Sequence, residues 1–259
     1  MEQIRVVKIG GNIINDDTLL QDFLKDFAAI EGKKILVHGG GKLATELAVQ
    51  LNVPQQMIEG RRITDDATLK IVTMVYAGYI NKSIVAQLHA NHCDALGISG
   101  ADGDIIEAHK RDSAIDYGFV GDIDSVNIEK LVALLDTFGT IVIAPITIDD
   151  QGQLLNTNAD TIAQEIAKAL SHDYYTKLIY TFEKTGVLLD VNDEESVIHK
   201  LDKAYYKVLK KEEKIFAGMI PKLDNAFQAL KDGVAAVYIG EAKDLKDLIA
   251  GNCGTKIVL

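Results

Sequence analysis

Val6-Val7-Lys8-Ile9-Gly10-Gly11 is a β-branched run that breaks abruptly into glycines, and Val37-His38-Gly39-Gly40-Gly41 repeats the arrangement. A helical pattern follows each glycine turn. Glycine lets backbone N–H groups approach an anion closely, and a helix N-terminus adds partial positive charge. Lys8, at the end of its strand, would bring an ammonium group to the same crevice. The two turns therefore predict a site that binds phosphate or another anion.

The composition excludes several classes of function. The chain has 259 residues, of which 47% are hydrophobic and 25% charged, so it can form one large α/β domain or two joined lobes. The formal charge of −11 disfavours nucleic-acid and membrane partners, although a local basic cleft for a small anion is compatible with it. Two cysteines, no leader sequence and no apolar run of ~20 residues predict a cytoplasmic protein.

Short buried strands alternate with amphipathic helices along the chain, which predicts a mainly parallel sheet covered on both faces, a three-layer αβα sandwich. The predicted strands are 4–9, 34–37, 95–98, 140–144 and 178–181, then 235–239 and an edge strand at 256–258. The predicted helices include 43–51, 128–135, 203–214, 218–231, one beginning at Asp16 or Asp17, and one ending near Leu170. Residues 105–123 are expected to form short strands and turns over the sheet.

Two lobes are expected, an N-terminal lobe of residues 1–173 and a C-terminal lobe of residues 174–259. No Gly/Ser-rich or Pro-rich linker marks the boundary near 171–177, so the lobes should share one continuous sheet. A long helical pattern over 65–91 is apolar on much of its surface. We expect this helix to pack against another subunit as well as against its own core.

The glycine turns alone leave alternatives open. Gly39-Gly40-Gly41-Lys42 is not a Walker loop, because Leu43 replaces the Ser or Thr that would hold Mg²⁺. The segment does fit a relaxed dinucleotide fingerprint that ends at Ala44, with Glu59 as a ribose partner, so an NAD-dependent dehydrogenase is one alternative. Tight strand-to-helix turns without any ligand are another.

Distant motifs sharpen this interpretation, because they occur in a fixed order along the whole chain. They are Lys8-Ile9-Gly10-Gly11, His38-Gly39-Gly40-Gly41, Gly60-x-Arg62-x-Thr64, Gly97-x-Ser99-Gly100-x-Asp102-Gly103, Asn156-x-Asn158-Ala159-Asp160 and Gly218-Met219-Ile220-Pro221-Lys222. This set resembles the amino acid kinase family. The Arg62 and Asn156 segments are similar to the branch of that family that acts on N-acylated glutamate.

The resemblance implies transfer of the γ-phosphoryl group of ATP to the side-chain carboxylate of an N-acyl-L-glutamate, either acetyl or the larger succinyl, in arginine biosynthesis. A carboxylate with a reference pKa of about 4.3 is already ionised near pH 7, so no general base is required. Lys8 and Lys222 would stabilise charge on the transferring group, and Asp160 would hold both ammonium groups by ion pairing. The substrate would be bound by Gly40, Gly41, Arg62 (a bidentate fork for a carboxylate) and Asn156.

For the nucleotide, the resemblance implies a site in the C-terminal lobe with contacts from Gly10, Gly11, Thr181 and Gly186. Mg²⁺ would be held chiefly by the phosphates, because the sequence offers no cluster of carboxylates and hence no metal site of its own. The segment 181–187 departs from the family, with one extra residue and Phe182 where Asp is usual. The adenine and ribose contacts of that loop therefore stay open; elsewhere Ala217 replaces a glycine and Lys42 a proline.

Other members of the family, namely aspartate, carbamate and glutamate kinases, would share the lysines but reject acylated glutamate. A binding or regulatory protein would bind ligand without releasing ADP. His89, His92 and Cys93 have helical spacing that could meet one metal, but a fourth ligand is missing. The resemblance also implies a homodimer through the 65–91 helix. Hexameric relatives that are inhibited by arginine carry an additional N-terminal helix. Because the given sequence begins at its first strand, neither arginine inhibition nor a hexamer is expected.

Overall fold

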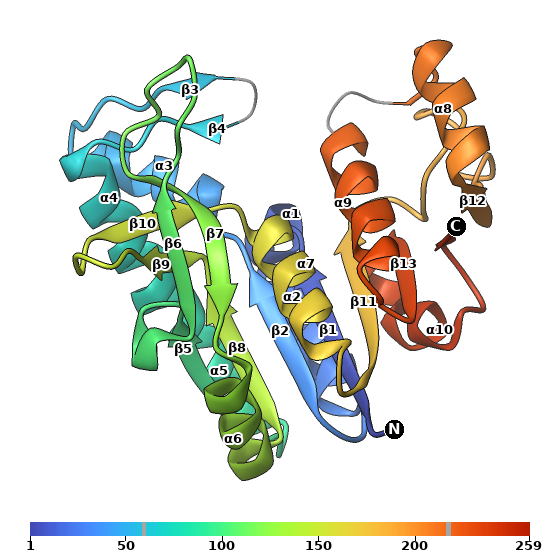
Figure 1. Ribbon diagram of the computed structural model, residues 1–259, viewed down its shortest axis with the longest axis horizontal. Coiled ribbons are helices and arrows are strands. Elements are labelled where there is room, and N and C mark those ends of the chain that lie inside the picture. Colours follow the sequence, from blue (N-terminus) through green and yellow to red (C-terminus); the bar gives the residue numbers. More distant parts are fainter. Residues whose placement is uncertain (59–60, 216–218) are drawn as a thin grey trace.

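The structure, a computed structural model, describes residues 1–58, 61–215 and 219–259. Within these residues the core is an eight-stranded sheet in the order β12-β14-β13-β11-β1-β2-β8-β5 (Figure 1). Its strands are β1 (Gln3–Ile9), β2 (Lys34–His38), β5 (Ala95–Ser99), β8 (Thr140–Ala144), β11 (Tyr175–Phe182), β12 (Lys200–Asp202), β13 (Ala236–Glu241) and β14 (Thr255–Val258). All neighbours pair in parallel except β13 and β14. The predicted mainly parallel sheet is confirmed.

Helices cover both faces of this sheet because its strands are apolar on both sides. Along β1, Ile4 and Val6 face one hydrophobic cluster, whereas Val7 and Ile9 face the other. The first cluster packs under α6 (Ile128–Phe138), α7 (Ala159–Leu170), α8 (Lys203–Lys211) and α9 (Ile220–Lys231). The second packs under α1 (Gly11–Ile14), α2 (Asp17–Ala28), α3 (Gly41–Gln50), α4 (Asp66–Thr73), α5 (Asn81–Ala90) and α10 (Leu245–Ala250).

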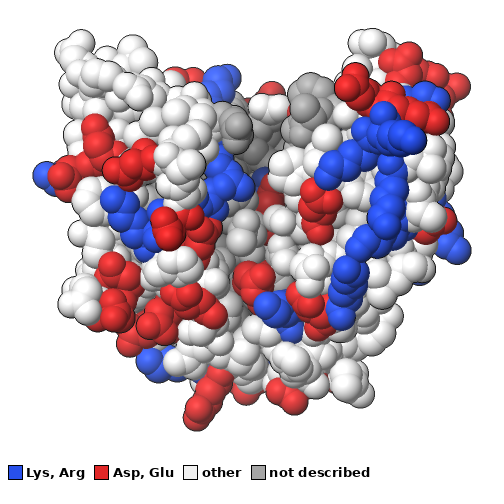
Figure 2. Space-filling view, turned by 45° about the horizontal axis from the view of Figure 1, so that its top comes forward, with Lys and Arg blue, Asp and Glu red and all other residues white. Residues whose placement is uncertain are grey.

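The sheet runs without a break from one half of the molecule to the other, as predicted. β1, β2, β5 and β8 come from the first 173 residues, and β1 pairs directly with β11 of the second half. The two halves rise beyond the carboxyl ends of the strands and leave a hollow between them, with basic side chains at its edge (Figures 1 and 2). In parallel sheets, ligands bind at this edge.

Two small β-structures stand above the main sheet on the N-terminal side. β6 (Ile106–Lys110), β7 (Val120–Val126), β9 (Ile146–Ile148) and β10 (Leu154–Thr157) form a separate, closed four-stranded sheet, and β3 (Met57–Ile58) pairs with β4 (Arg61–Arg62). Strands over the sheet were expected for 105–123, but β9, β10 and the β3–β4 hairpin follow from no sequence pattern. These strands are two to four residues long, which is too short for an alternation of apolar and polar residues to be recognised.

The long predicted helix is continuous but changes its winding midway. A π-helical segment, η1 (Met74–Ile80), joins α4 to α5, and the dihedral angles at both junctions remain right-handed helical. Asn81, which follows this segment, is fully buried, and its side-chain Nδ2 donates to the carbonyls of Ile98 and Val142 at 3.3 and 3.1 Å. The helix is thereby fixed to the carboxyl edge of the sheet.

One predicted strand position is wrong. β14 was expected at the edge, but it lies between β12 and β13, and β12 is outermost. Ile257 and Leu201 are both buried, so the last strand is covered by a short strand whose sequence shows no β pattern. In the part of the chain that the structure describes, no helix has the length and apolar character needed to cross a membrane.

Candidate active site

Asp160 makes two ion pairs, and the one with Lys222 joins the two halves of the molecule. It lies in the first turn of α7, which Asn158 caps by accepting hydrogen bonds from the backbone N–H groups of Asp160 and Thr161 at 2.8 and 3.2 Å. The Nζ atom of Lys8, near the end of β1, lies 2.8 Å from Asp160 Oδ1. The Nζ atom of Lys222, in the first turn of α9, lies 2.9 Å from Asp160 Oδ2. The predicted ion pairing is confirmed.

These three charged groups carry a net positive charge in a nearly closed setting. The side chains of Lys8, Lys222 and Asp160 are 13%, 11% and 22% exposed. Burial opposes ionisation of Asp160, but the two ammonium groups outweigh it and hold the pKa of its carboxyl well below its usual value. Burial, together with the charge of Lys8, lowers the pKa of Lys222. An anion bound here would relieve the repulsion between the lysines.

Tyr180 of β11 contacts both Asp160 and Lys222. Its hydroxyl donates to the backbone carbonyl of Asp160 at 3.1 Å, and Lys222 Nζ lies 4.9 Å from the centre of its ring. Burial raises the pKa of Tyr180 well above its ordinary value, so the phenol stays neutral. The contact therefore combines a hydrogen bond with a cation–π interaction and fixes the positions of both partners.

A cavity of about 430 Å³ opens beside the two lysines. Its walls include Lys8 and Lys222, the glycines Gly10, Gly11 and Gly186, and a largely apolar set formed by Phe182, Val187, Leu188, Val191, Ile215 and Met219. An apolar wall next to backbone N–H groups and two cations fits a nucleotide, with the base on the wall and the phosphates at the lysines. Gly218 and Ala217 lie outside the described residues.

Thr181 does not line this cavity. Its side chain is fully buried, and its Oγ1 donates to the carbonyl of Lys8 at 3.0 Å, while its own carbonyl accepts from the backbone N–H of Gly10. A Cβ on Gly10 would approach the Thr181 carbonyl to 3.2 Å. Thr181 therefore holds the first glycine turn against β11, and its own contact with nucleotide stays a prediction.

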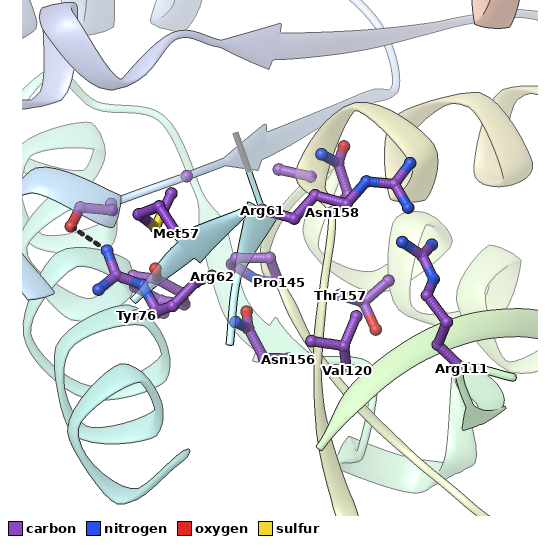
Figure 3. A pocket seen from close by; sticks show the side chains of 14 residues that line it. Met57, Arg61, Arg62, Tyr76, Arg111, Val120, Pro145, Asn156, Thr157 and Asn158 are labelled. Atoms are coloured by element: carbon purple, nitrogen blue, oxygen red, sulfur yellow. Dashed lines mark hydrogen bonds between the residues drawn. The ribbon is translucent and has the colours of Figure 1, made fainter. Parts of the chain in front are cut away.

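A second cavity, of about 190 Å³, has Asn158 and Ala159, the two residues before Asp160, in its lining. It is lined by the triple-glycine turn, Arg61, Arg62, Tyr76, Arg111, Asn156 and the start of α7, among others (Figure 3). Asn156, on β10, donates from Nδ2 to Thr64 Oγ1 at 3.0 Å. The structure thus brings Gly40, Gly41, Arg62 and Asn156 together as predicted, although Gly60 of the same motif lies outside the described residues.

Arg62 contacts the protein more extensively than its motif suggests. Its Nη2 donates to the Gly41 carbonyl and to Thr45 Oγ1, both at 2.8 Å, and its Nη1 donates to Gln55 Oε1. Only 7% of the residue is exposed. Arg62 therefore fastens the glycine turn to the β3–β4 hairpin, and the predicted bidentate grip on a substrate carboxylate would require it to exchange at least one of these partners.

His38, the polar residue that precedes the triple glycine, has a structural role. Burial lowers the pKa of its imidazole to about 4, so the ring is neutral near pH 7. Nδ1 donates to the Gly39 carbonyl at 2.8 Å, and Nε2 lies 3.3 Å from Asn81 Nδ2, whose two hydrogens are shared with the carbonyls of Ile98 and Val142. His38 and Asn81 therefore connect the second glycine turn to the long helix, a structural role with no proton transfer.

Gly40 is required by its surroundings. Its φ is +154°, and a Cβ there would come within 2.3 Å of Ile80 Cδ1 and 2.9 Å of Tyr76 Cδ1. We expect Gly40→Ala to lower the free energy of unfolding by about 2 kcal/mol, because the new methyl group displaces the buried η1 side chains. Urea unfolding would measure it. Gly39→Ala, where a Cβ meets nothing within 4 Å, is the control and should change stability by less than about 0.5 kcal/mol.

His89, His92 and Cys93 have helical spacing that could meet one metal, although the sequence offers no fourth ligand. Over residues 1–58, 61–215 and 219–259, no group of three His, Cys, Asp or Glu side chains is placed to hold a metal ion. His89 Nε2 instead contacts the Ala95 carbonyl at 3.0 Å, and Cys93 Sγ lies 3.4 Å from Thr140 Oγ1. Both residues are accounted for by packing around the end of α5.

Three residues of the second cavity were missed by sequence reasoning. Arg61 reads as half of a solvated arginine pair, Arg111 lies in a segment without a motif, and Tyr76 fits the apolar pattern of a long helix. Their common feature is that they face one cavity from β4, from the end of β6 and from η1. No spacing rule connects such distant segments.

The comparison with known proteins fits this geometry. A model described as the amino acid kinase family matches residues 3–241. The chain belongs to the amino acid kinase family. Among other members of the family, the acetylglutamate kinase of Cytophaga hutchinsonii is 50% identical over 262 residues, which cover 100% of this chain and 99% of the relative. That of Parabacteroides distasonis is 51% identical over 246 residues, covering 95% and 96%.

Solved structures share the same fold. The crystal structure of smu.665 from Streptococcus mutans UA159 superposes with a TM-score of 0.77 and 26% identity, over 98% of each chain. The predicted amino acid kinase-like fold is therefore confirmed. Membership of a kinase family also removes the dehydrogenase interpretation, and Glu59, its expected ribose partner, lies outside the described residues.

Proposed function

We propose that this chain is an acetylglutamate kinase, which transfers the γ-phosphoryl group of ATP to the side-chain carboxylate of an N-acyl-L-glutamate in arginine biosynthesis. The observation that carries the proposal is the bridge of Lys8, Asp160 and Lys222 between an apolar cavity and an arginine-lined cavity. Relatives about 50% identical over nearly the whole chain bear that name. Both the size of the cavities and the name of the relatives indicate a small-molecule substrate.

The residues support such a transfer by position and charge. The acceptor carboxylate needs no base, since it is ionised near pH 7. Lys8 and Lys222 bring two ammonium groups to the wall of the apolar cavity, and Asp160 holds both in place by ion pairing. The N–H groups of the two glycine turns add donors from either side. Charge that spreads over the transferring phosphoryl oxygens is thereby stabilised, which is the main task in phosphoryl transfer.

Mg²⁺ is part of the proposal through the nucleotide. Glu183 is the acidic residue among the described residues that line the nucleotide cavity, and no carboxylate cluster accompanies it. Such a site suits a metal that keeps most of its water and is held by substrate phosphates. The ion would neutralise phosphate charge, while Lys8 and Lys222 orient the phosphates.

We assign one substrate to each lobe according to the residues that line the two cavities. The described residues that line the arginine-rich cavity all fall between Gly39 and Ala159, inside the proposed acyl-glutamate lobe of residues 1–173. The nucleotide cavity is lined mainly by residues 182–222 of the proposed ATP lobe, with Lys8, Gly10 and Gly11 contributed by the other. A cytoplasmic location remains part of the proposal; Cys93 and Cys253 are both free thiols.

Trapping of an acyl phosphate by hydroxylamine tests the function directly. The protein would be incubated with MgATP and N-acetyl-L-glutamate, N-succinyl-L-glutamate, L-glutamate, L-aspartate or carbamate. Hydroxamate formed with an acylated glutamate but not with L-glutamate is the expected result. Hydroxamate formed only with L-glutamate or L-aspartate, or ADP released only with carbamate, would assign the chain to another branch of the family.

A homodimer through the long helix is also proposed. Met74 and Tyr79 of η1 are 54% and 68% exposed, and they border a surface hollow with Leu43, Leu47 and Val75. We expect light scattering to give twice the chain mass of 28.2 kDa, and Tyr79→Glu to produce monomers, because a buried charge opposes an apolar interface. Val208→Glu, at a 48% exposed site on α8, is the control and should stay dimeric. A monomeric parent protein would refute the proposal.

A further inference from the structure

A hairpin over residues 187–198 forms one wall of the nucleotide cavity. It is closed by an antiparallel bridge between Leu188 and Val197. Val191 lies at its tip and lines the cavity, although this residue is 50% exposed. A half-exposed apolar side chain beside a cavity fits a ligand that brings an apolar surface, because the contact removes both surfaces from water. In the proposed nucleotide site, that surface is the base.

Lys184 ties the tip of this hairpin to the loop that precedes it. Its Nζ atom donates to the Glu194 carboxylate and, at 3.4 Å, to the Val191 carbonyl. Thr185 adds two further donors, its backbone N–H and its Oγ1 atom, which lie 3.4 and 3.2 Å from Glu194 Oε2. The Glu194 carboxylate therefore accepts three hydrogen bonds from two neighbouring residues, and these bonds fix the position of the tip.

The ion pair of Lys184 and Glu194 begins in the segment in which this sequence departs from its family. Residues 181–187 include one residue more than usual, and Lys184 and Thr185 belong to that stretch. The hydrogen bond from Lys184 is the largest influence that lowers the pKa of Glu194, so its carboxyl is ionised near pH 7. The two side chains are 33% and 47% exposed, so the pair adds little to global stability. Its effect is local, because it determines where the hairpin tip lies.

Lys184 also lines the cavity, so direct contact with the nucleotide phosphates is the competing role for it. Two acceptors already engage its ammonium group, which leaves one of its three donors. Lys8 and Lys222 place their ammonium groups together on Asp160, at 2.8 and 2.9 Å, whereas Lys184 turns to Glu194 and the hairpin tip. The contacts of Lys184 therefore favour a role in positioning the cavity wall.

We propose that Lys184 and Glu194 form a latch that holds Val191 against the base of the bound nucleotide, so that Glu194 is a positioning residue for ATP. This inference rests on the proposed function and deepens it. The latch acts on the wall that meets the base and not on the phosphates, so it sets the affinity for ATP without taking part in phosphoryl transfer.

The test measures the Kd for MgATP by isothermal titration calorimetry in Glu194→Gln and Lys184→Gln. Long-range electrostatics alone predicts opposite changes, because the first variant removes a negative charge near an anion site and the second removes a positive one. The latch predicts the same change in both: each should raise the Kd by about fivefold, the upper range for an exposed ion pair. Lys184→Glu should raise the Kd further, and adding Glu194→Lys should recover part of that increase.

Inorganic tripolyphosphate, bound together with Mg²⁺, separates the contribution of the base from that of the phosphates. It has no base to contact Val191, so its Kd should not rise in Glu194→Gln. Asp26→Asn is the matched control, because it removes a carboxylate that pairs with Lys246 at 2.8 Å and does not line the nucleotide cavity. Its Kd values for MgATP and for tripolyphosphate should stay within about twofold of those of the parent protein.

An unchanged or lower Kd for MgATP in Glu194→Gln would overturn the latch. An equal rise of the Kd for MgATP and for tripolyphosphate would do the same, as would a double charge reversal that binds no better than Lys184→Glu. All three results leave the kinase function intact. Failure of the proposed function has a different signature, namely folded protein that forms no hydroxamate with any N-acyl-L-glutamate, whatever its Kd for MgATP.

Discussion

Lys8→Ala and Lys222→Ala are each expected to lower turnover of an N-acyl-L-glutamate by about a hundredfold or more, with the fold retained. Each lysine lines the apolar cavity and places an ammonium group within 3 Å of Asp160. Phosphoryl transfer spreads negative charge over the transferring group, so removing one cation there raises the barrier more than it weakens binding. The loss should therefore fall on kcat more than on either KM.

Single-turnover trapping with hydroxylamine at saturating MgATP would measure this effect, and circular dichroism would verify the fold. Lys168→Ala is the control, since its ammonium pairs with Glu165 on the solvent side of α7 at 3.0 Å. It should retain near-normal turnover. Turnover within about threefold of the parent protein in Lys8→Ala or Lys222→Ala would remove that lysine from the mechanism.

Asp160→Asn is expected to damage both activity and stability. The amide has the shape of the carboxylate but leaves two buried ammonium groups without a counter-charge, and this should lower the free energy of unfolding by about 3 kcal/mol at pH 7. Turnover should fall by about a hundredfold or more, because the lysines then repel each other away from the transferring group.

The pH dependence of stability distinguishes this ion-pair role from simple packing. Although burial opposes its ionisation, the two lysines hold the pKa of Asp160 below its ordinary value of 3.8. Its contribution to stability is therefore fully present above that value. It is lost as the pH falls toward the folded-state pKa, by about 1.4 kcal/mol per pH unit.

Urea unfolding at pH 7 and pH 3 would measure this change, and the difference between parent and Asp160→Asn should shrink at pH 3. Asp224→Asn is the matched control on α9, because it removes an exposed partner of Lys210 at 3.2 Å. Its effect should stay below about 1 kcal/mol at both values. A parent–variant difference that is independent of pH would refute the ion-pair role.

Much of this molecule can be predicted from local sequence. The runs that end at Gly10 and Gly39 are buried strands followed by glycine turns, because β-branched residues and glycine have strong backbone preferences that neighbours rarely override. The continuous sheet follows from strand–helix alternation without a linker. The pairing of Lys8 and Lys222 with Asp160 was implied by the family resemblance, and the two ion-pair distances agree with it.

Other features depend on contacts between distant segments, which no local pattern encodes. β14 lies inside the sheet because the short β12 returns to cover it. Thr181 lies behind the first glycine turn because β11 pairs beside β1, so its hydroxyl contacts Lys8 instead of the cavity. Arg61 and Arg111 face one cavity only because the β3–β4 hairpin and the closed four-stranded sheet fold over the same edge. Periodicity and turn chemistry set each element, whereas burial and pairing across the whole chain set which side chains meet.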